Sequence, residues 1–367
     1  MTNLRHQQLA KVLVHYSLKI QPGDKLVIHS PLSATPLVRE VYREALHAGA
    51  YITTRINVDD LDEIMLREGN EEQLTYVSEL DTFENEHFNK YLGIWASQNT
   101  RALSKIKPER IALRSKAYAP ISKRFLERAA TGEFHWCGTL FPMQAHAQDA
   151  GMSLSDYEDF VYGAGLLNQD NPEAAWRKID EEQKRIANFL EQHNEIHIVA
   201  PGTDITYHVG GRKWISCAGE VNFPDGEVFT GPIEDSVNGT VRFTYPAVYN
   251  GNEVEDVQLT FQNGKVVTAT AGRGLDFLNA MLDMDAGSRF LGEVAFGLNY
   301  NVKQFTKDIL FDEKIGGTMH MALGESYPET GGKNESDLHW DMVCDLHEGR
   351  VYADEQLCYE NGKFIIG

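Results

Sequence analysis

The chain has few cysteines, no long apolar run and far fewer basic than acidic residues. The four cysteines form no C-x-x-C pair, which argues against a zinc knuckle or a disulfide scaffold and predicts reduced, mostly buried thiols. A serine hydrolase of the nucleophile-elbow type is disfavoured because no G-x-S-x-G sequence occurs. We also find no internal repeat and no low-complexity tract.

No apolar run approaches the roughly 20 residues that a transmembrane helix needs. The first twenty residues mix apolar and polar side chains, as in an ordinary helix and not as in a signal peptide. The net charge is −20, from 34 basic and 54 acidic residues, so the average field repels nucleic acid and anionic lipid. We therefore expect a cytoplasmic protein that binds neither nucleic acid nor membranes.

The chain has 367 residues, 42% of them hydrophobic, and is longer than a domain with a single hydrophobic core usually is. This length predicts two domains, which we place at 1–193 and 194–367. The first shows a strand at 25–29, a helix at 33–50 and a strand at 51–56, which together predict a βαβ unit. The remaining signals predict strands at 91–95 and 135–140 and helices at 59–68, 121–131 and 155–165. The first domain is thus predicted to be α/β, with helices covering a sheet.

A polar helix is predicted at about 171–192. The part of the sequence after it shows mainly strand signals. Short β-rich runs follow one another there, and Asn263-Gly264 between two of them is a strong hairpin signal. Asn361-Gly362 marks a second hairpin, and only one helix is expected, at about 275–284. The second domain is therefore predicted to be a β-rich (α+β) domain.

Oxygen and nitrogen side chains that bind divalent metals gather in this second domain, at irregular spacings broken by Gly and Pro. They are Glu293, Glu313, His320, Glu325, His339 and Asp341, with Glu227 upstream in a Pro-Asp-Gly bend. Carboxylates and imidazoles are ligands for hard and borderline divalent cations. The pattern indicates a metal-binding β domain, to which no cysteine contributes.

The alternation of a strand sorts some of these side chains. If 339–344 is a strand, His339 and Asp341 lie on one face while Trp340 and Met342 lie on the other. The same alternation places His320 on a face with small neighbours, which leaves space for an ion. An isolated H-x-D pair is equally typical of a surface histidine beside an acid.

Each acid also has a simpler interpretation. Glu293 lies in an otherwise apolar strand, where burial of a carboxylate is costly unless a cation compensates it, yet an edge-strand glutamate facing water fits the same pattern. Glu313 fits a solvated loop acid paired with Lys314. The metal hypothesis is favoured because five or six such positions converge on one domain beside Gly-rich bends.

Four segments, at 223–232, 292–299, 310–324 and 339–341, resemble in order the thermophilic aminopeptidase family of dinuclear metallopeptidases. The resemblance covers the whole chain. It implies that two divalent ions are bound by Glu227, Glu293, Glu313, His320, His339 and Asp341. It also implies that Tyr327 occupies the family's catalytic tyrosine position.

The implied function is a metal-dependent aminopeptidase, in which two ions activate a water that hydrolyses N-terminal residues from peptides. Glu293, or next Asp341, is expected to bridge the ions and Tyr327 to stabilise the oxyanion. Glu325 is either a general base or a neighbouring acid. The ions are zinc, cobalt, manganese or magnesium, with family habit favouring cobalt or zinc, and the family's habit also implies a homodimer.

Two other classes use similar ligands. The first is a different dinuclear metallohydrolase, an amidohydrolase or a phosphoesterase, although the net negative charge disfavours phosphate substrates. The second is a non-enzymatic binding protein stabilised by metal. A calcium-stabilised domain is disfavoured because calcium sites seldom use histidine.

Overall fold

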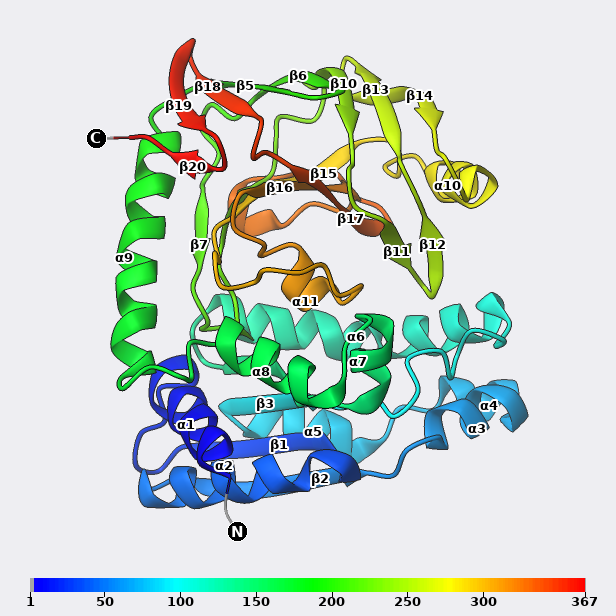
Figure 1. Cartoon of the computed structure of the whole chain (residues 1–367). Coiled ribbons are helices and arrows are strands. Elements are labelled where there is room, and N and C mark those ends of the chain that lie inside the picture. Colours follow the sequence, from blue (N-terminus) through cyan, green and yellow to red (C-terminus); the bar gives the residue numbers. More distant parts are fainter. Residues whose placement is uncertain (1–2, 367) are drawn as a thin grey trace. The chain divides into compact units, whose positions relative to one another are not determined.

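The computed structural model describes residues 3–366, which divide into two compact units (Figure 1). The first unit contains the chain up to Glu173 together with Gly219–Phe223, and the second contains Ala174–Ala218 and the chain from Pro224 onward. The boundary placed between residues 193 and 194 stays a prediction, because a division by contacts does not show which segments fold on their own. Within residues 3–366, none of the helices combines the length and apolar character that membrane crossing requires.

The first unit is built on a parallel five-stranded sheet in the order β2-β1-β3-β4-β8. Its strands are β1 (Lys25–Pro31), β2 (Tyr51–Asn57), β3 (Lys90–Trp95), β4 (His135–Leu140) and β8 (Asn222–Phe223). The short strand β8 comes from the segment that returns to this unit from the second half of the sequence. The predicted βαβ unit and the strands near 91–95 and 135–140 are confirmed.

The described part of the first unit contains eight α-helices. They are α1 (Leu4–Lys11), α2 (Thr35–His47), α3 (Leu61–Glu68), α4 (Glu71–Thr75), α5 (Glu79–His87), α6 (Pro108–Ala130), α7 (Gln144–Asp149) and α8 (Leu154–Ala164). Of these, α3 and α4 lie off to one side of the sheet (Figure 1). Helix α2 buries Leu37, Val38 and Val41 and packs against β1 and β2. The helix predicted at 121–131 is the second half of α6, which continues through Pro120 although proline usually ends a helix.

In the described part of the second unit, helix α9 (Pro172–Leu190) leads into two large antiparallel sheets and a third that has only two strands, β11 and β12. The larger sheet has the order β14 (Lys265–Thr270), β13 (Gln258–Gln262), β10 (Asn238–Arg242), β6 (Thr203–His208), β5 (Glu195–Ala200), β18 (Arg350–Ala353), β19 (Gln356–Glu360), β20 (Lys363–Phe364). The smaller has the order β17 (His339–Asp345), β16 (Thr318–Gly324), β15 (Leu291–Gly297), β9 (Glu227–Thr230), β7 (Ile215–Cys217). The remaining elements are β11 (Ala247–Tyr249), β12 (Asn252–Val254), α10 (Leu275–Leu282) and α11 (Ile309–Asp312).

Side chains from both sheets form one hydrophobic core in this unit. Ile198 and Leu259 of the larger sheet are members of the same core as Phe296 and Met321 of the smaller sheet. The hairpin at Asn263-Gly264 joins β13 to β14, with both residues at positive φ, 49° and 80°, as such a turn requires. The predicted α/β first part and β-rich second part both occur in the structure.

Candidate metal centre

The smaller sheet has one apolar face and one face that carries the candidate ligands. Trp340 and Met342 of β17 belong to the core, whereas His339 and Asp341 alternate with them and face the other way. The neighbouring strand β16 presents His320 on that same second face. Since the first face packs on the larger sheet, the polar side chains collect on the second.

A β-bulge at Gly292 sends Glu293 to this face. Leu291 pairs with Leu323, while Glu293 pairs with Ala322, so Gly292 is one extra residue opposite the β16 strand. Without the bulge Glu293 would follow Leu291 into the core, because residues two apart share a face. A Cβ at Gly292 would lie 2.0 Å from the carbonyl oxygen of Glu325, so only glycine fits there.

Glu293 lies between two imidazoles. Its Oε1 is 3.4 Å from Nε2 of His320, and its Oε2 is 3.5 Å from Nε2 of His339. Nε2 of His320 also lies 3.2 Å from Glu227, and Nε2 of His339 lies 3.5 Å from Asp341. One carboxylate therefore joins two groups of possible ligands, one on each of its oxygens.

The electrostatics of this cluster follow from its excess of acids. Burial lowers the pKa of His320, but the hydrogen bond and charge of Glu293 and the charge of Glu227 outweigh burial and raise it to about 9. Burial also lowers the pKa of His339, yet Asp341 and Glu293 raise it to about 10. Burial raises the pKa of Glu293, but its hydrogen bonds with the two imidazoles lower it to about 2. The acids around the two imidazoles thus favour positive charge in this cluster.

A buried lysine fixes two other acids. Nζ of Lys314 lies 2.5 Å from Oε1 of Glu227 and 2.5 Å from Oε1 of Glu313, and 3.5 Å from Asp225. Burial lowers the pKa of Lys314, but these three carboxylates raise it well above its usual value. The lysine side chain is only 2% exposed, so its ammonium is a fixed internal cation beside the ligand cluster.

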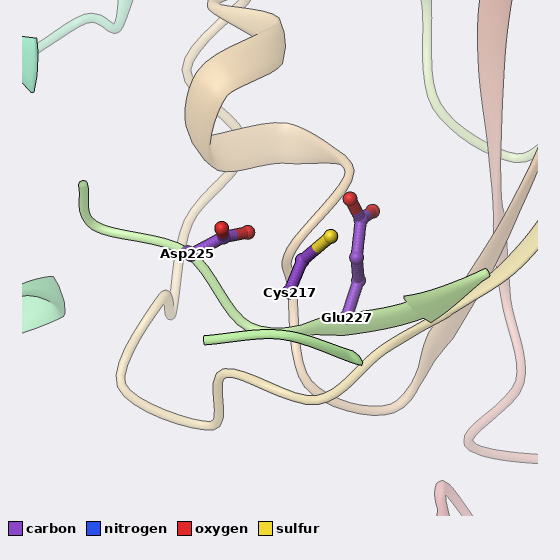
Figure 2. Close-up of side chains that lie close together, drawn as sticks. All are labelled: Cys217, Asp225 and Glu227. Carbon is purple, nitrogen blue, oxygen red and sulfur yellow. The ribbon is translucent and has the colours of Figure 1, made fainter. Parts of the chain in front are cut away.

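Figure 2 shows a second group of possible ligands, which consists of Cys217, Asp225 and Glu227. Lys314 accounts for the closeness of the two acids in this group. Cys217 and Glu227 are register partners on β7 and β9, and Asp225 approaches from the preceding turn. Burial, followed by the charges of Asp225 and Glu227, raises the pKa of the Cys217 thiol. A neutral thiol is a poor metal ligand, and Lys314 already supplies the cation for both acids.

Glu313 pairs with Lys314, as its simpler interpretation requires, but the pair is not a solvated one. Helix α11 ends at Asp312, and Glu313 follows as its C-cap residue. One oxygen atom of Glu313 lies within 4.8 Å of ligand atoms of His320 and Asp341. The alternative of an edge-strand Glu293 facing water is excluded, because that residue is 4% exposed on an internal strand.

Tyr327 and Glu325 lie beside His339. The rings of Tyr327 and His339 meet edge to face, with centroids 5.2 Å apart. The backbone carbonyl of Glu325 is 2.9 Å from Nδ1 of His339, so it orients that ring with Nε2 toward Glu293. The carboxylate of Glu325 accepts a hydrogen bond from the backbone N–H of Ser336, 2.6 Å away.

The cluster is suited to bind cations. Oε2 of Glu227 and Oδ1 of Asp341 are buried and accept no hydrogen bond from any group in residues 3–366. Three linked groups of possible ligands share their members: Glu227, Glu293 and His320; Glu293, His339 and Asp341; Glu313, His320 and Asp341. Buried carboxylate oxygens that accept no hydrogen bond are costly, and a divalent ion would compensate them.

The structure therefore brings together the six residues predicted to be metal ligands, with Tyr327 next to them. Sequence reasoning did not assign Asp225 or Lys314 to the site. The only signal for Lys314 was its position after Glu313, which equally describes a surface pair. Its burial depends on the packing of the segment after α11 and on no local pattern.

Comparison with known proteins identifies the family. The profile of the thermophilic metalloprotease (M29) family matches residues 2–364. The chain belongs to this family. It is 32% identical to "Aminopeptidase 2" of Geobacillus stearothermophilus, over 94% of this chain and 93% of the relative.

Two further comparisons concern Thermus thermophilus. "Aminopeptidase T" of that organism is 27% identical over 97% of this chain and 95% of its own length. The solved structure of wild-type AmpT from the same organism superposes with a TM-score of 0.87 at 25% identity and covers 99% of both chains. Membership makes this chain a metalloprotease with the fold of that relative.

Proposed function

We propose that this metalloprotease is an aminopeptidase that removes N-terminal residues from peptides at a centre of two divalent ions. The ions would be held by Glu227, Glu293, Glu313, His320, His339 and Asp341. The observation that carries the proposal is the position of Glu293, whose two oxygens face different imidazoles. A carboxylate in that position suits a bridge between two neighbouring ions.

The protein's own groups prepare this centre. The carbonyl of Glu325 fixes the ring of His339, and Lys314 holds Glu227 and Glu313 in place. When bound, the ions supply Lewis acidity and lower the pKa of a coordinated water. The residual negative charge of the acids attracts the ammonium group of a peptide N-terminus.

Tyr327 is proposed to donate a hydrogen bond to the oxygen that develops negative charge during hydrolysis. Burial, followed by the charges of Glu293 and Asp341, raises the pKa of its hydroxyl. The hydroxyl therefore stays protonated at neutral pH and is available as a donor. Its contact with the His339 ring places it at the edge of the cluster.

Removal and return of metal test the proposed function. We expect a chelator to abolish hydrolysis of aminoacyl anilides, and zinc, cobalt, manganese or magnesium, added singly, to restore it to different extents. N-blocked peptides should not be cleaved. Cleavage of blocked peptides instead would favour an amidohydrolase or endopeptidase, and preference for a phosphate ester would favour a phosphoesterase. Full turnover after complete metal removal would exclude the metal centre.

The Tyr327→Phe variant tests the hydroxyl. We expect kcat to fall by about 10²–10³, in the range for loss of one oxyanion donor, with metal content unchanged. Steady-state kinetics and elemental analysis of the same sample measure both quantities. Tyr51→Phe is a matched control, because Tyr51 is 70% exposed in the first unit. An unchanged kcat would remove Tyr327 from the mechanism.

The cytoplasmic location and the homodimer stay predictions. Light scattering coupled to size-exclusion chromatography measures the assembly directly. A mass near twice the 41.3 kDa of one chain is the expected result.

A further inference from the structure

The first unit contains a cavity of about 500 Å³ that plays no part in the metal centre. It lies between one face of the parallel sheet and the helices α5 and α6. Val27 and His29 of β1 and Tyr91 of β3 line it from the sheet, and Tyr118 and Phe125 line it from α6. Its volume is within the range of small-molecule sites.

Two paired glycines hollow the sheet at this place. Gly93 of β3 and Gly138 of β4 are register partners and both line the cavity. A Cβ at Gly138 would lie 2.4 Å from the ring of Trp95, so the flat ring requires a glycine below it. Trp95, Trp136 and Phe125 contribute aromatic surface around the cavity.

The sheet topology favours a ligand site at the same place. Strand β2 lies on one side of β1 and strand β3 on the other, so the order of the parallel strands reverses between β1 and β3. Ligands of open α/β sheets bind at such a switch point, near the carboxyl ends of the strands. Asn57 and Trp95, the last residues of β2 and β3, both line the cavity.

The charged groups of the cavity already satisfy one another. Nε and Nη1 of Arg55 donate to Glu84 and Asp81 at 2.6 and 3.0 Å. The second oxygen of Glu84 is 3.0 Å from Nε2 of His29, and the second oxygen of Asp81 accepts from Tyr118 at 2.8 Å. Each of the four carboxylate oxygens is therefore engaged, and two acids oppose the one guanidinium.

Arg55 and Asn85, which both line the cavity, each have one polar atom without a hydrogen-bond partner in the described residues. Nη2 of Arg55 and Oδ1 of Asn85 are buried and have no hydrogen-bond partner within residues 3–366. Asn85 itself is 8% exposed. The first atom is a donor and the second an acceptor, and unpaired buried groups of this kind are costly.

We propose that this cavity binds an uncharged planar heterocycle with a ring carbonyl and a ring N–H, as in a purine or pyrimidine base. The carbonyl would accept from Arg55, the N–H would donate to Asn85, and the flat body would lie among the aromatic rings. An anion is disfavoured because Asp81 and Glu84 already oppose the charge of Arg55. A cation is disfavoured because no carboxylate oxygen is unengaged.

Calorimetric titration of the full-length protein with hypoxanthine and with thymine tests this site. For ligands of about ten non-hydrogen atoms we expect a dissociation constant on the order of 10–100 µM for at least one of them. Binding should weaken at least tenfold in Gly93→Leu, which fills the cavity, and in Asn85→Ala, which removes the acceptor. Gly163→Ala is a control, because no atom lies within 4 Å of a Cβ built there.

The circular dichroism spectrum reports whether each variant is folded, and peptidase activity reports whether the metal centre, which belongs to the other unit, is intact. Absence of saturable binding to the wild-type protein would overturn the proposal. Equal binding by Gly93→Leu would also overturn it, because the ligand would then be bound elsewhere. Tighter binding of inorganic phosphate or of an organic ammonium ion than of either base would contradict the assignment of an uncharged ligand.

Discussion

Glu293→Ala is expected to lose both metal ions and nearly all peptidase activity. Glu293 faces His320 with one oxygen and His339 with the other, so its removal would take a ligand from both ions of the proposed centre. We expect kcat/KM to fall by at least about 10³-fold, or ~4 kcal/mol of transition-state stabilisation. Elemental analysis of the dialysed protein measures the metal content directly.

Two further variants make this result specific. Glu348→Ala removes an exposed glutamate of the same unit and should keep two ions and full activity. Glu293→Gln keeps the shape but replaces one ligand oxygen by a weakly binding amide nitrogen, so it should retain less metal than the wild type. Two retained ions in Glu293→Ala would refute the assigned bridge.

Lys314→Met is expected to destabilise the metal-free protein by about 3–5 kcal/mol, the usual cost of removing one partner of a buried ion pair. The ammonium lies 2.5 Å from both Glu227 and Glu313, and without it the buried Glu227 and the part-buried Glu313 have no fixed cation between them. Denaturant unfolding of the chelated protein measures the loss.

Divalent metal should restore much of this stability, because an ion bound only by the folded state stabilises it by about 4 kcal/mol at a thousandfold excess over its dissociation constant. The control Lys303→Met removes an exposed lysine of the same unit. Equal stability of Lys314→Met and the wild type without metal would show that the ammonium does not hold the acids in place.

The burial of Lys314 among acids was not predicted from the sequence, for a physical reason. A lysine beside a glutamate in a loop is most often exposed, and nothing within 310–317 distinguishes it from such a pair. Its neighbours Glu227 and Asp225 are almost ninety residues away in the sequence. Contacts of that separation depend on how β9 and the segment after α11 are packed together.

The sequence alone was sufficient for local and periodic features. Alternation separated His339 and Asp341 from Trp340, and Asn-Gly pairs located two hairpins, because strand periodicity and positive φ are properties of short segments. The acidic and histidine side chains around residues 293 and 339 indicated metal chemistry. The segments that contain them were specific enough to show the resemblance to known peptidases.

Only the tertiary structure decided where the acids meet. Simple alternation from Leu291 would bury Glu293 in the core, and the bulge at Gly292 reverses its direction. That bulge depends on the close approach of the Glu325 carbonyl, which a Cβ would block. The cavity at Gly93 likewise depends on strand register. Side-chain types and spacings thus follow from the sequence, whereas register, bulges and buried charge pairs follow from packing between distant segments.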